Sequence, residues 1–185
     1  MNGHDETASE SIRGQYERYG VQGYYERSGD TYRNPHEAAI RVVLRQAVEH
    51  WRPDVSHVLD LACGSGEVTL ALRELGCTAI DGIDPYTGDA YLERTDQIAD
   101  SYTFENIAAG AISDRSYSLI VCSFALHLVE ESRLPTLAYQ LSLIAPALVI
   151  ITPHKRPHLR NSWGWSLQDE FVVERVRTRL YQAIR

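Results

Sequence analysis

The chain has 185 residues, of which 44% are hydrophobic and 23% charged, so it has the composition of one globular domain and is too short for two. Its 18 Lys and Arg stand against 25 Asp and Glu, and the net charge of −7 argues against a general nucleic-acid binder. No run approaches the roughly 20 apolar residues of a membrane span, so we expect no membrane association. Three widely spaced cysteines provide neither a disulfide framework nor a metal pair, which favours a cytoplasmic location and no metal site.

The first 34 residues predict an N-terminal extension in front of a domain over residues 35–185. Residues 1–10 are polar, and we expect this start to be disordered. Residues 11–33 hold five tyrosines and four glycines. Because a segment so rich in aromatic rings is unlike a free linker, we expect it to pack over the domain as a lid.

An amphipathic helix is predicted over residues 35–51. Its apolar side chains, from Ile40 to Trp51, recur at spacings of three and four. Asn34 is expected to cap this helix, and Glu37 is placed where the acid of a capping box reaches back. Pro53 ends the pattern.

Five short apolar runs alternate with helical patterns after this helix. The runs predicted as strands are 58–61, 79–84, 102–107, 119–122 and 147–152. Helices are predicted between them over 68–75, 87–95 and 134–143. Strands that are apolar on both faces and alternate with helices are typical of a covered parallel sheet. The sequence therefore predicts an α/β fold, a doubly wound, mostly parallel Rossmann-like sheet of six or seven strands with helices on both faces.

The last part of the chain predicts one or two further strands within residues 171–181. Val176, Thr178 and Leu180 alternate with arginines, which is the pattern of a half-exposed edge strand. Residues 151–185 carry seven Lys or Arg against three acids, a local charge of +4, so the first 150 residues carry −11.

Two acidic residues follow the first two predicted strands. In a parallel sheet, ligands bind outside the carboxyl ends of the strands, and glycines allow the backbone to approach a ligand closely. The first strand runs into Asp60-Leu61-Ala62-Cys63-Gly64-Ser65-Gly66, and the second ends at Asp84. A carboxylate at Asp84 can accept hydrogen bonds from two ribose hydroxyls, which indicates a nucleoside. Asp84 before Pro85 is also compatible with a simple turn.

The loop does not match a dinucleotide site. Thr69 stands where the third glycine of that fingerprint belongs. Asp60 lies just before the turn, where a carboxylate would repel a diphosphate and attract an ammonium group. The pattern therefore indicates a nucleoside that carries a cationic amino acid.

Four segments in order resemble the class I S-adenosylmethionine-dependent methyltransferases. Residues 58–66 resemble motif I of this family, and Gly82-Ile83-Asp84-Pro85 resembles the motif after its second strand. Asn106-Ile107 resembles the pair that faces adenine, and residues 119–127 resemble the fourth-strand segment of small single-domain members. The likeness covers residues 35–153, and it implies S-adenosylmethionine as the cofactor.

The resemblance also implies which residues bind this cofactor. They are Tyr25, Arg33, Asp60, Ala62, Cys63, Gly64, Gly66, Asp84, Pro85, Asn106, Ile107, Ser123 and Phe124. Asp60 and the backbone from 62 to 66 would hold the methionine end, and Asp84 the ribose. Asn106 and Ile107 would contact adenine, while Ser123 and Phe124 would lie beside the sulfonium. Tyr25 and Arg33 would close over the cofactor, with Arg33 paired to its carboxylate.

The acceptor side is less defined by the sequence. His127 is a candidate general base, needed only for an acceptor that must lose a proton; a side chain packed between two leucines is the alternative. His154, Lys155 and Arg156 follow the fifth predicted strand and could bind an anionic acceptor, or remain a solvated loop. The residues after Val121 lack the side-chain amide suited to exocyclic base nitrogens, which disfavours nucleic acid.

We therefore expect a methyltransferase that uses S-adenosylmethionine and acts on a small-molecule acceptor. An anionic acceptor is one candidate. One alternative is a non-catalytic member of the fold that assists a protein partner. The other is a nicotinamide-dependent oxidoreductase.

Overall fold

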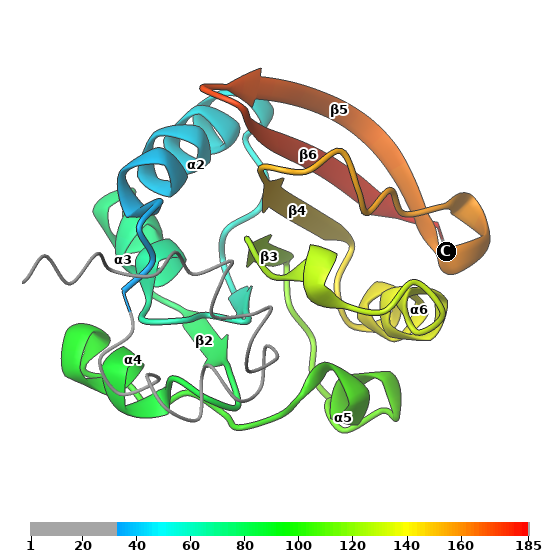
Figure 1. Ribbon diagram of the computed structural model, residues 1–185, viewed down its shortest axis with the longest axis horizontal. Helices are drawn as coiled ribbons and strands as arrows, with labels where there is room; N and C mark the ends of the chain where they lie inside the picture. The colour runs from blue at the N-terminus through cyan, green and yellow to red at the C-terminus, as the bar shows by residue number, and fades with distance from the viewer. Residues whose placement is uncertain (1–32, 185) are drawn as a thin grey trace, which may run out of the picture.

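A six-stranded sheet runs through the protein, which the computed structural model describes from residue 33 to residue 184 (Figure 1). Its strands are β1 (Val58–Leu61), β2 (Ile80–Ile83), β3 (Leu119–Ser123), β4 (Ala147–Thr152), β5 (Trp165–Val173) and β6 (Val176–Ala183). The α-helices are α2 (Glu37–Trp51), α3 (Glu67–Glu74), α4 (Gly88–Thr95), α5 (Phe104–Ala108) and α6 (Leu134–Ile144). Two short 3-10 helices, η2 (Leu126–Leu128) and η3 (Asn161–Trp163), complete the described part.

The sheet has the order β2-β1-β3-β4-β6-β5. Strands β2, β1, β3 and β4 pair in parallel, whereas β6 is antiparallel to both of its neighbours. The predicted Rossmann-like arrangement is thus confirmed for the parallel half, and the sheet as a whole is mixed. Among the described helices, none is both long and apolar enough to cross a membrane.

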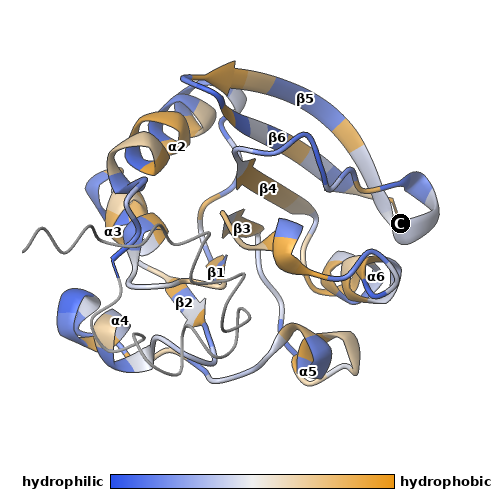
Figure 2. Ribbon diagram, viewed as in Figure 1, coloured by the Kyte–Doolittle hydropathy of each residue, from blue (hydrophilic) through white to orange (hydrophobic). Residues whose placement is uncertain are grey.

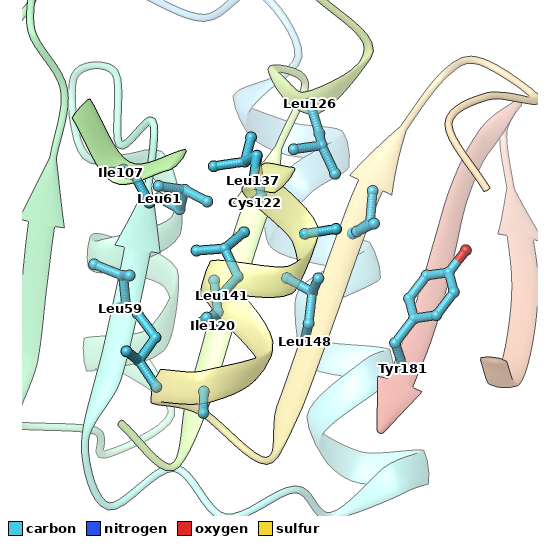
Figure 3. Packing of buried hydrophobic residues seen from close by; sticks show 14 of the residues in the cluster. Leu59, Leu61, Ile107, Ile120, Cys122, Leu126, Leu137, Leu141, Leu148 and Tyr181 are labelled. Atoms are coloured by element: carbon cyan, nitrogen blue, oxygen red, sulfur yellow. The ribbon is translucent and has the colours of Figure 1, made fainter. Parts of the chain in front are cut away.

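Alternate residues of the parallel strands pack on opposite faces of the sheet. Leu59 of β1 and Ile120 of β3 belong to a core beneath α5 and α6, seen closely in Figure 3. Val58 and Val121 belong to a second core beneath α2 and α3. Both faces are therefore covered, and Figure 2 shows the hydrophobic colour concentrated in the central strands and on the side of α2 that faces them.

The prediction of a strand over residues 102–107 is wrong. Thr103 caps helix α5 there, and its side chain and that of Asn106 form a reciprocal capping box. A single bridge between Ile83 and Asp100 marks the place beside β2 where a further strand would pair. The alternation of aromatic and polar residues suggested a strand, but the local hydrogen bonds of the cap favour a helix.

The C-terminal hairpin departs from the edge prediction for residues 176–181. Strand β6 lies inside the sheet, between β4 and β5, and the outer strand is β5. The hairpin turns at Glu174 and Arg175. Both residues have positive φ values, as the two central residues of a type I′ turn require. Arg179, one of the arginines that suggested solvent exposure, is fully buried and bonded to Glu170.

The start of α2 also differs from the expected cap. The helix begins at Glu37, and the side chain of Asn34 accepts a hydrogen bond from the amide of His36 instead of capping the helix. The carboxylate of Glu37 binds Arg94 of α4 at 2.7 Å, so this residue links two helices.

Trp165 fastens the hairpin to helix α6. Its ring is fully buried, and its indole Nε1 donates to the carbonyl oxygen of Ala138 at 2.7 Å. We expect Trp165→Phe to lower the free energy of unfolding by about 2–4 kcal/mol, because it leaves a void and an unpaired carbonyl. Urea denaturation measures this change. Leu167→Ala, on the exposed side of the same strand, should cost less than about 1 kcal/mol, and an equal loss in both variants would contradict the assignment.

Candidate functional site

A cavity of about 490 Å³ opens at the carboxyl ends of β1, β2 and β3. This volume is within the usual range for a small-molecule or cofactor site. Eight of the residues expected to bind the cofactor line it: Ala62, Cys63, Gly64, Asp84, Pro85, Ile107, Ser123 and Phe124. The sequence motifs at the ends of separate strands thus meet around one space, called the cofactor cavity below.

The loop after β1 is shaped by left-handed backbone angles. Ala62 has a φ of 57° and Gly64 a φ of 56°. Gly66, with a φ of 90°, does not line the cavity and instead closes the turn before α3. A Cβ at Gly66 would lie 2.4 Å from Cγ2 of Thr95, so a glycine is needed there for both conformation and space.

Asp84 connects the tips of β1 and β2. Its Oδ2 accepts the amide hydrogen of Gly64 at 3.2 Å, and its Oδ1 accepts from the amides of Tyr86 and Thr87 at 2.9 and 3.2 Å. Burial raises the pKa of this carboxyl, while these hydrogen bonds oppose the change. The carboxyl is therefore fixed in orientation at the cavity wall.

Asp60 lies beneath the loop and is completely buried, so it does not line the cavity. Its Oδ2 accepts hydrogen bonds from the amide and hydroxyl of Thr69 at 3.0 and 2.7 Å. Its Oδ1 is buried without a hydrogen-bond partner among the described residues. Burial raises the pKa of Asp60 to about 7, and the negative charges of Glu67 and Asp84 add to the effect. An ammonium group above the loop would be a positively charged partner for this carboxylate.

Glu67 is a cavity residue that the sequence analysis did not identify. It is the first residue of α3, and its Oε1 accepts from Arg94 at 3.0 Å and from the amide of Asn34 at 3.2 Å. Its position at a helix N-terminus, next to the glycine loop, is the signal that could have found it. A carboxylate there also disfavours a diphosphate, which needs the same helix end.

Other wall residues come from segments without a recognisable motif. They include Tyr102, Phe104, Glu105, Leu128, Glu130 and Arg133. Arg133, which directly precedes α6, bonds Glu105 of α5 at 3.0 Å and pairs with Glu130 at 3.3 Å. These residues meet only when α5 and α6 pack together, so spacing along the chain could not reveal them.

Besides Asp60 and Gly66, two more described residues expected at the cofactor, Arg33 and Asn106, do not line the cavity. Asn106 uses its side-chain oxygen for the α5 cap, accepting from the amide and hydroxyl of Thr103. The Arg33 guanidinium lies 3.8 Å from the carboxylate of Glu93. Tyr25 lies outside the described residues, as does the predicted lid up to residue 32.

Three of the four residues expected at the acceptor lie at or beside a second cavity. His127 and Arg156 line this neighbouring space, and the ring of His154 packs 4.3 Å from that of His127. Burial lowers the pKa of His127 to about 4, and the neighbouring His154 contributes. His127 is thus neutral near pH 7, and its role as a base stays a prediction. Lys155 lines neither cavity.

Comparison with known proteins agrees with this geometry. Residues 31–181 match a family described as a methyltransferase domain. The chain belongs to this family. It is a class I S-adenosylmethionine-dependent methyltransferase, as the four sequence segments and the fold around the cofactor cavity both indicate.

One relative and several solved structures resemble this methyltransferase. The chain is 32% identical over 228 residues to the uncharacterized protein C17A5.05c of Schizosaccharomyces pombe, covering 94% of this chain and 92% of that one. The PH0226 protein of Pyrococcus horikoshii has a TM-score of 0.64 at 11% identity, with 91% and 99% of the two chains covered. Magnesium protoporphyrin IX methyltransferase of Synechocystis, with bound SAM, has a TM-score of 0.58 at 16% identity, with 94% and 95% covered. An rRNA methylase of Escherichia coli has a TM-score of 0.59 at 19% identity, with 80% and 65% covered. These three likenesses show a shared fold.

The cysteines of the methyltransferase are suited to packing. Cys63 and Cys122 are both buried, and burial raises the pKa of each thiol, that of Cys122 to about 12. The thiols are therefore neutral near pH 7, which agrees with small core side chains and not with nucleophiles.

The raised pKa of Asp60 gives a prediction about stability. The native state holds this proton more tightly than the unfolded state, so the contribution of Asp60 to stability is greatest below pH 4 and is lost as the pH rises toward 7. Asn does not titrate, and its side-chain oxygen can still accept from Thr69. We expect Asp60→Asn to become more stable relative to the wild type between pH 4 and pH 7, by on the order of 2–4 kcal/mol.

Urea unfolding at several pH values in this range measures the change. Asp89→Asn, at an exposed position on α4, serves as the control and should follow the wild type. Parallel pH profiles for Asp60→Asn and the wild type would contradict the assignment.

Proposed function

We propose that this methyltransferase transfers a methyl group from S-adenosylmethionine to a small-molecule acceptor that enters the cofactor cavity beside Ser123 and Phe124. The observation that supports it most is the convergence of Asp84, the Gly64 loop and the end of β3 on one cavity. S-adenosylmethionine, when bound, supplies a methyl group on a positively charged sulfur.

The acids at one end of the cavity suit the methionine part of this cofactor. Glu67 lines the wall, and the unpartnered Oδ1 of Asp60 lies beneath the loop. Their charge would stabilise an ammonium group, Asp60 acting through the loop or a bridging water because it is buried. Gly64 has no Cβ to obstruct a ligand that approaches its backbone.

The other end of the cavity suits the nucleoside. Asp84 already accepts three backbone amides, and its carboxylate keeps lone pairs that could accept ribose hydroxyls. Ile107 and the aromatic rings of Tyr102 and Phe104 form a wall against which an adenine ring could stack. Asn106 would have to leave the α5 cap to reach adenine through its side chain.

The chain accelerates the transfer mainly by positioning the acceptor. Methyl transfer is an in-line displacement, and holding the reacting atoms close in the right geometry can supply a large part of the rate. Phe124 has a φ of 53°, and its ring stacks on that of His36 at 4.8 Å, which would help to orient it on the wall beside the reaction space. A base is needed only for an acceptor that loses a proton.

The charge of the cavity wall favours a small molecule over a nucleic acid. Four carboxylates, of Glu67, Asp84, Glu105 and Glu130, line the described wall with one guanidinium, that of Arg133. Phosphate groups bind where basic side chains predominate, so this mouth would repel a nucleic-acid strand. The cytoplasmic location and the lid formed by residues 1–34 over a domain of residues 35–185 remain parts of this proposal.

Asp84→Ala tests the cofactor assignment. We expect the affinity for S-adenosylhomocysteine to fall about 10–100-fold, because hydrogen bonds to a charged acceptor are lost. Isothermal titration calorimetry measures this affinity, and Asp89→Ala is the matched control because it removes an exposed carboxylate nearby on α4. Unchanged affinity in a folded Asp84→Ala protein would remove the ribose assignment.

An acceptor screen tests the transfer. We expect formation of S-adenosylhomocysteine from S-adenosylmethionine with members of a small-molecule panel and no methyl incorporation into RNA. Incorporation into RNA or protein alone would overturn the acceptor class. Cofactor binding without turnover on any acceptor would instead support the non-catalytic alternative.

A further inference from the structure

A second cavity of about 370 Å³ lies beside the cofactor cavity. Its walls are formed by His127, Val129, Glu131, Leu134, Arg156, Pro157, His158, Arg160 and Trp163. Val129 lines both cavities, whereas Leu128 and Glu130 line only the cofactor cavity. The two cavities therefore share Val129 as a wall residue, and a molecule in both would have to pass this side chain.

The second cavity carries two guanidinium groups and one carboxylate, that of Glu131. Arg160 has no carboxylate within ion-pair distance among the described residues, and its guanidinium stacks over the ring of Trp163 at 5.0 Å. Arg156 approaches Glu131 only to 3.8 Å, and both side chains are largely exposed. Such exposed pairs contribute little, so both guanidinium groups can bind an anion.

A buried arginine holds the segment that carries these cations. Arg179 is fully buried and donates to the carbonyl oxygens of Lys155 and Pro157 at 2.7 and 2.9 Å. It also binds Glu170 at 2.5 Å and lies 3.3 Å from Nε2 of His158. Since a guanidinium only donates, His158 accepts through Nε2, and burial together with Arg179 lowers its pKa. The backbone on both sides of Arg156 is thus fixed before any ligand binds.

Four other wall residues of the cavity offer apolar surface, while His127 and Glu131 add polar groups. Val129, Leu134, Pro157 and the ring of Trp163 offer surfaces for a flat, hydrophobic body. A site with an apolar body and two guanidinium groups at its rim fits an aromatic carboxylate better than a chain of phosphates, because its volume is small and Glu131 lies on the same wall.

We propose that the second cavity binds the acceptor of the methyl group through a carboxylate on an aromatic ring, held by Arg156 and Arg160. This inference rests on the proposed function, because the reacting atom must then reach past Val129 into the cofactor cavity. It replaces Lys155, which the sequence suggested, by Arg160, whose place beside Arg156 depends on the folded loop.

Benzoate, with benzyl alcohol as a neutral molecule of similar shape, is the probe for this site. The chain has three tryptophans, and the indole N–H resonance of Trp163 can be assigned with Trp163→Phe and followed by NMR in the full chain. We expect benzoate to shift this resonance, benzyl alcohol to leave it unchanged, and the resonance of Trp51, bound to Asp169, to stay in place.

Arg160→Gln should weaken benzoate binding about tenfold or more, because a charge-assisted hydrogen bond is lost. Arg45→Gln makes the same change of charge on the exposed side of α2 and should leave the affinity as it is. Equal response to benzoate and benzyl alcohol, or equal affinity in Arg160→Gln and the wild type, would overturn the inference.

S-adenosylhomocysteine in the same sample separates this inference from the proposed function. We expect both ligands to bind together, because the two cavities are distinct. Failure of S-adenosylhomocysteine to bind would overturn the proposed function. If S-adenosylhomocysteine binds but benzoate does not shift the Trp163 resonance, only the inference about the second cavity is overturned. The same holds if S-adenosylhomocysteine displaces benzoate. A short RNA that shifts Trp163 where benzoate does not would overturn the small-molecule class.

Discussion

The hydrogen bond from the amide of Gly64 to the carboxylate of Asp84 ties together the two strand tips on which the cofactor cavity depends. The hydroxyl of Thr87 strengthens this connection by donating to the carbonyl of Gly64 at 2.7 Å. Both the backbone N–H and the backbone C=O of Gly64 are therefore held by residues that follow β2, which fixes the loop at this position. The same carboxylate faces the cavity, so the group that fixes the loop is also the group proposed to bind the ribose.

Two kinds of sequence signal succeeded in predicting this arrangement. Buried parallel strands are apolar on both faces, and this made β1, β3 and β4 recognisable from short runs of residues. The loop from Ala62 to Gly66 was recognisable because its glycines directly follow a strand. Both signals are local and depend on few residues, so they can be recognised in one sequence without further information.

The two failures have different physical origins, one a local capping box and the other a contact between segments distant in the chain. The segment from Tyr102 to Ile107 alternates like a strand, and the decision for a helix comes from two side chains that cap each other. Arg179 alternates like an exposed residue, but the carbonyl groups of the loop from Lys155 to Pro157 surround it. The carbonyl groups that bind Arg179 lie more than 20 residues before it in the chain, so the pattern within β6 could not predict these contacts.

Charge is divided between the two adjoining cavities. Among the charged residues on the described wall of the cofactor cavity, four are acids and one is an arginine, and we propose that these acids suit the ammonium and sulfonium groups of S-adenosylmethionine. The second cavity is bordered by Arg156 and Arg160. Arg156 and Arg160 both belong to the basic last part of the chain, whereas the four acids of the cofactor cavity belong to its acidic first 150 residues. Opposite surfaces on either side of Val129 would orient two substrates of opposite charge.

The buried carboxyl of Asp60 lowers the stability of the folded protein when it is ionised. A buried carboxyl with one oxygen lacking a partner among the described residues is unfavourable in its ionised form, and its raised pKa expresses that cost. An apolar residue in its place would avoid the cost but would also remove the acceptor that orients the start of α3 through Thr69. The cost falls when a positive group binds above the loop, since the charge that destabilises the free protein then attracts the ligand. In the proposed function, Asp60 would thus favour a cation at this site.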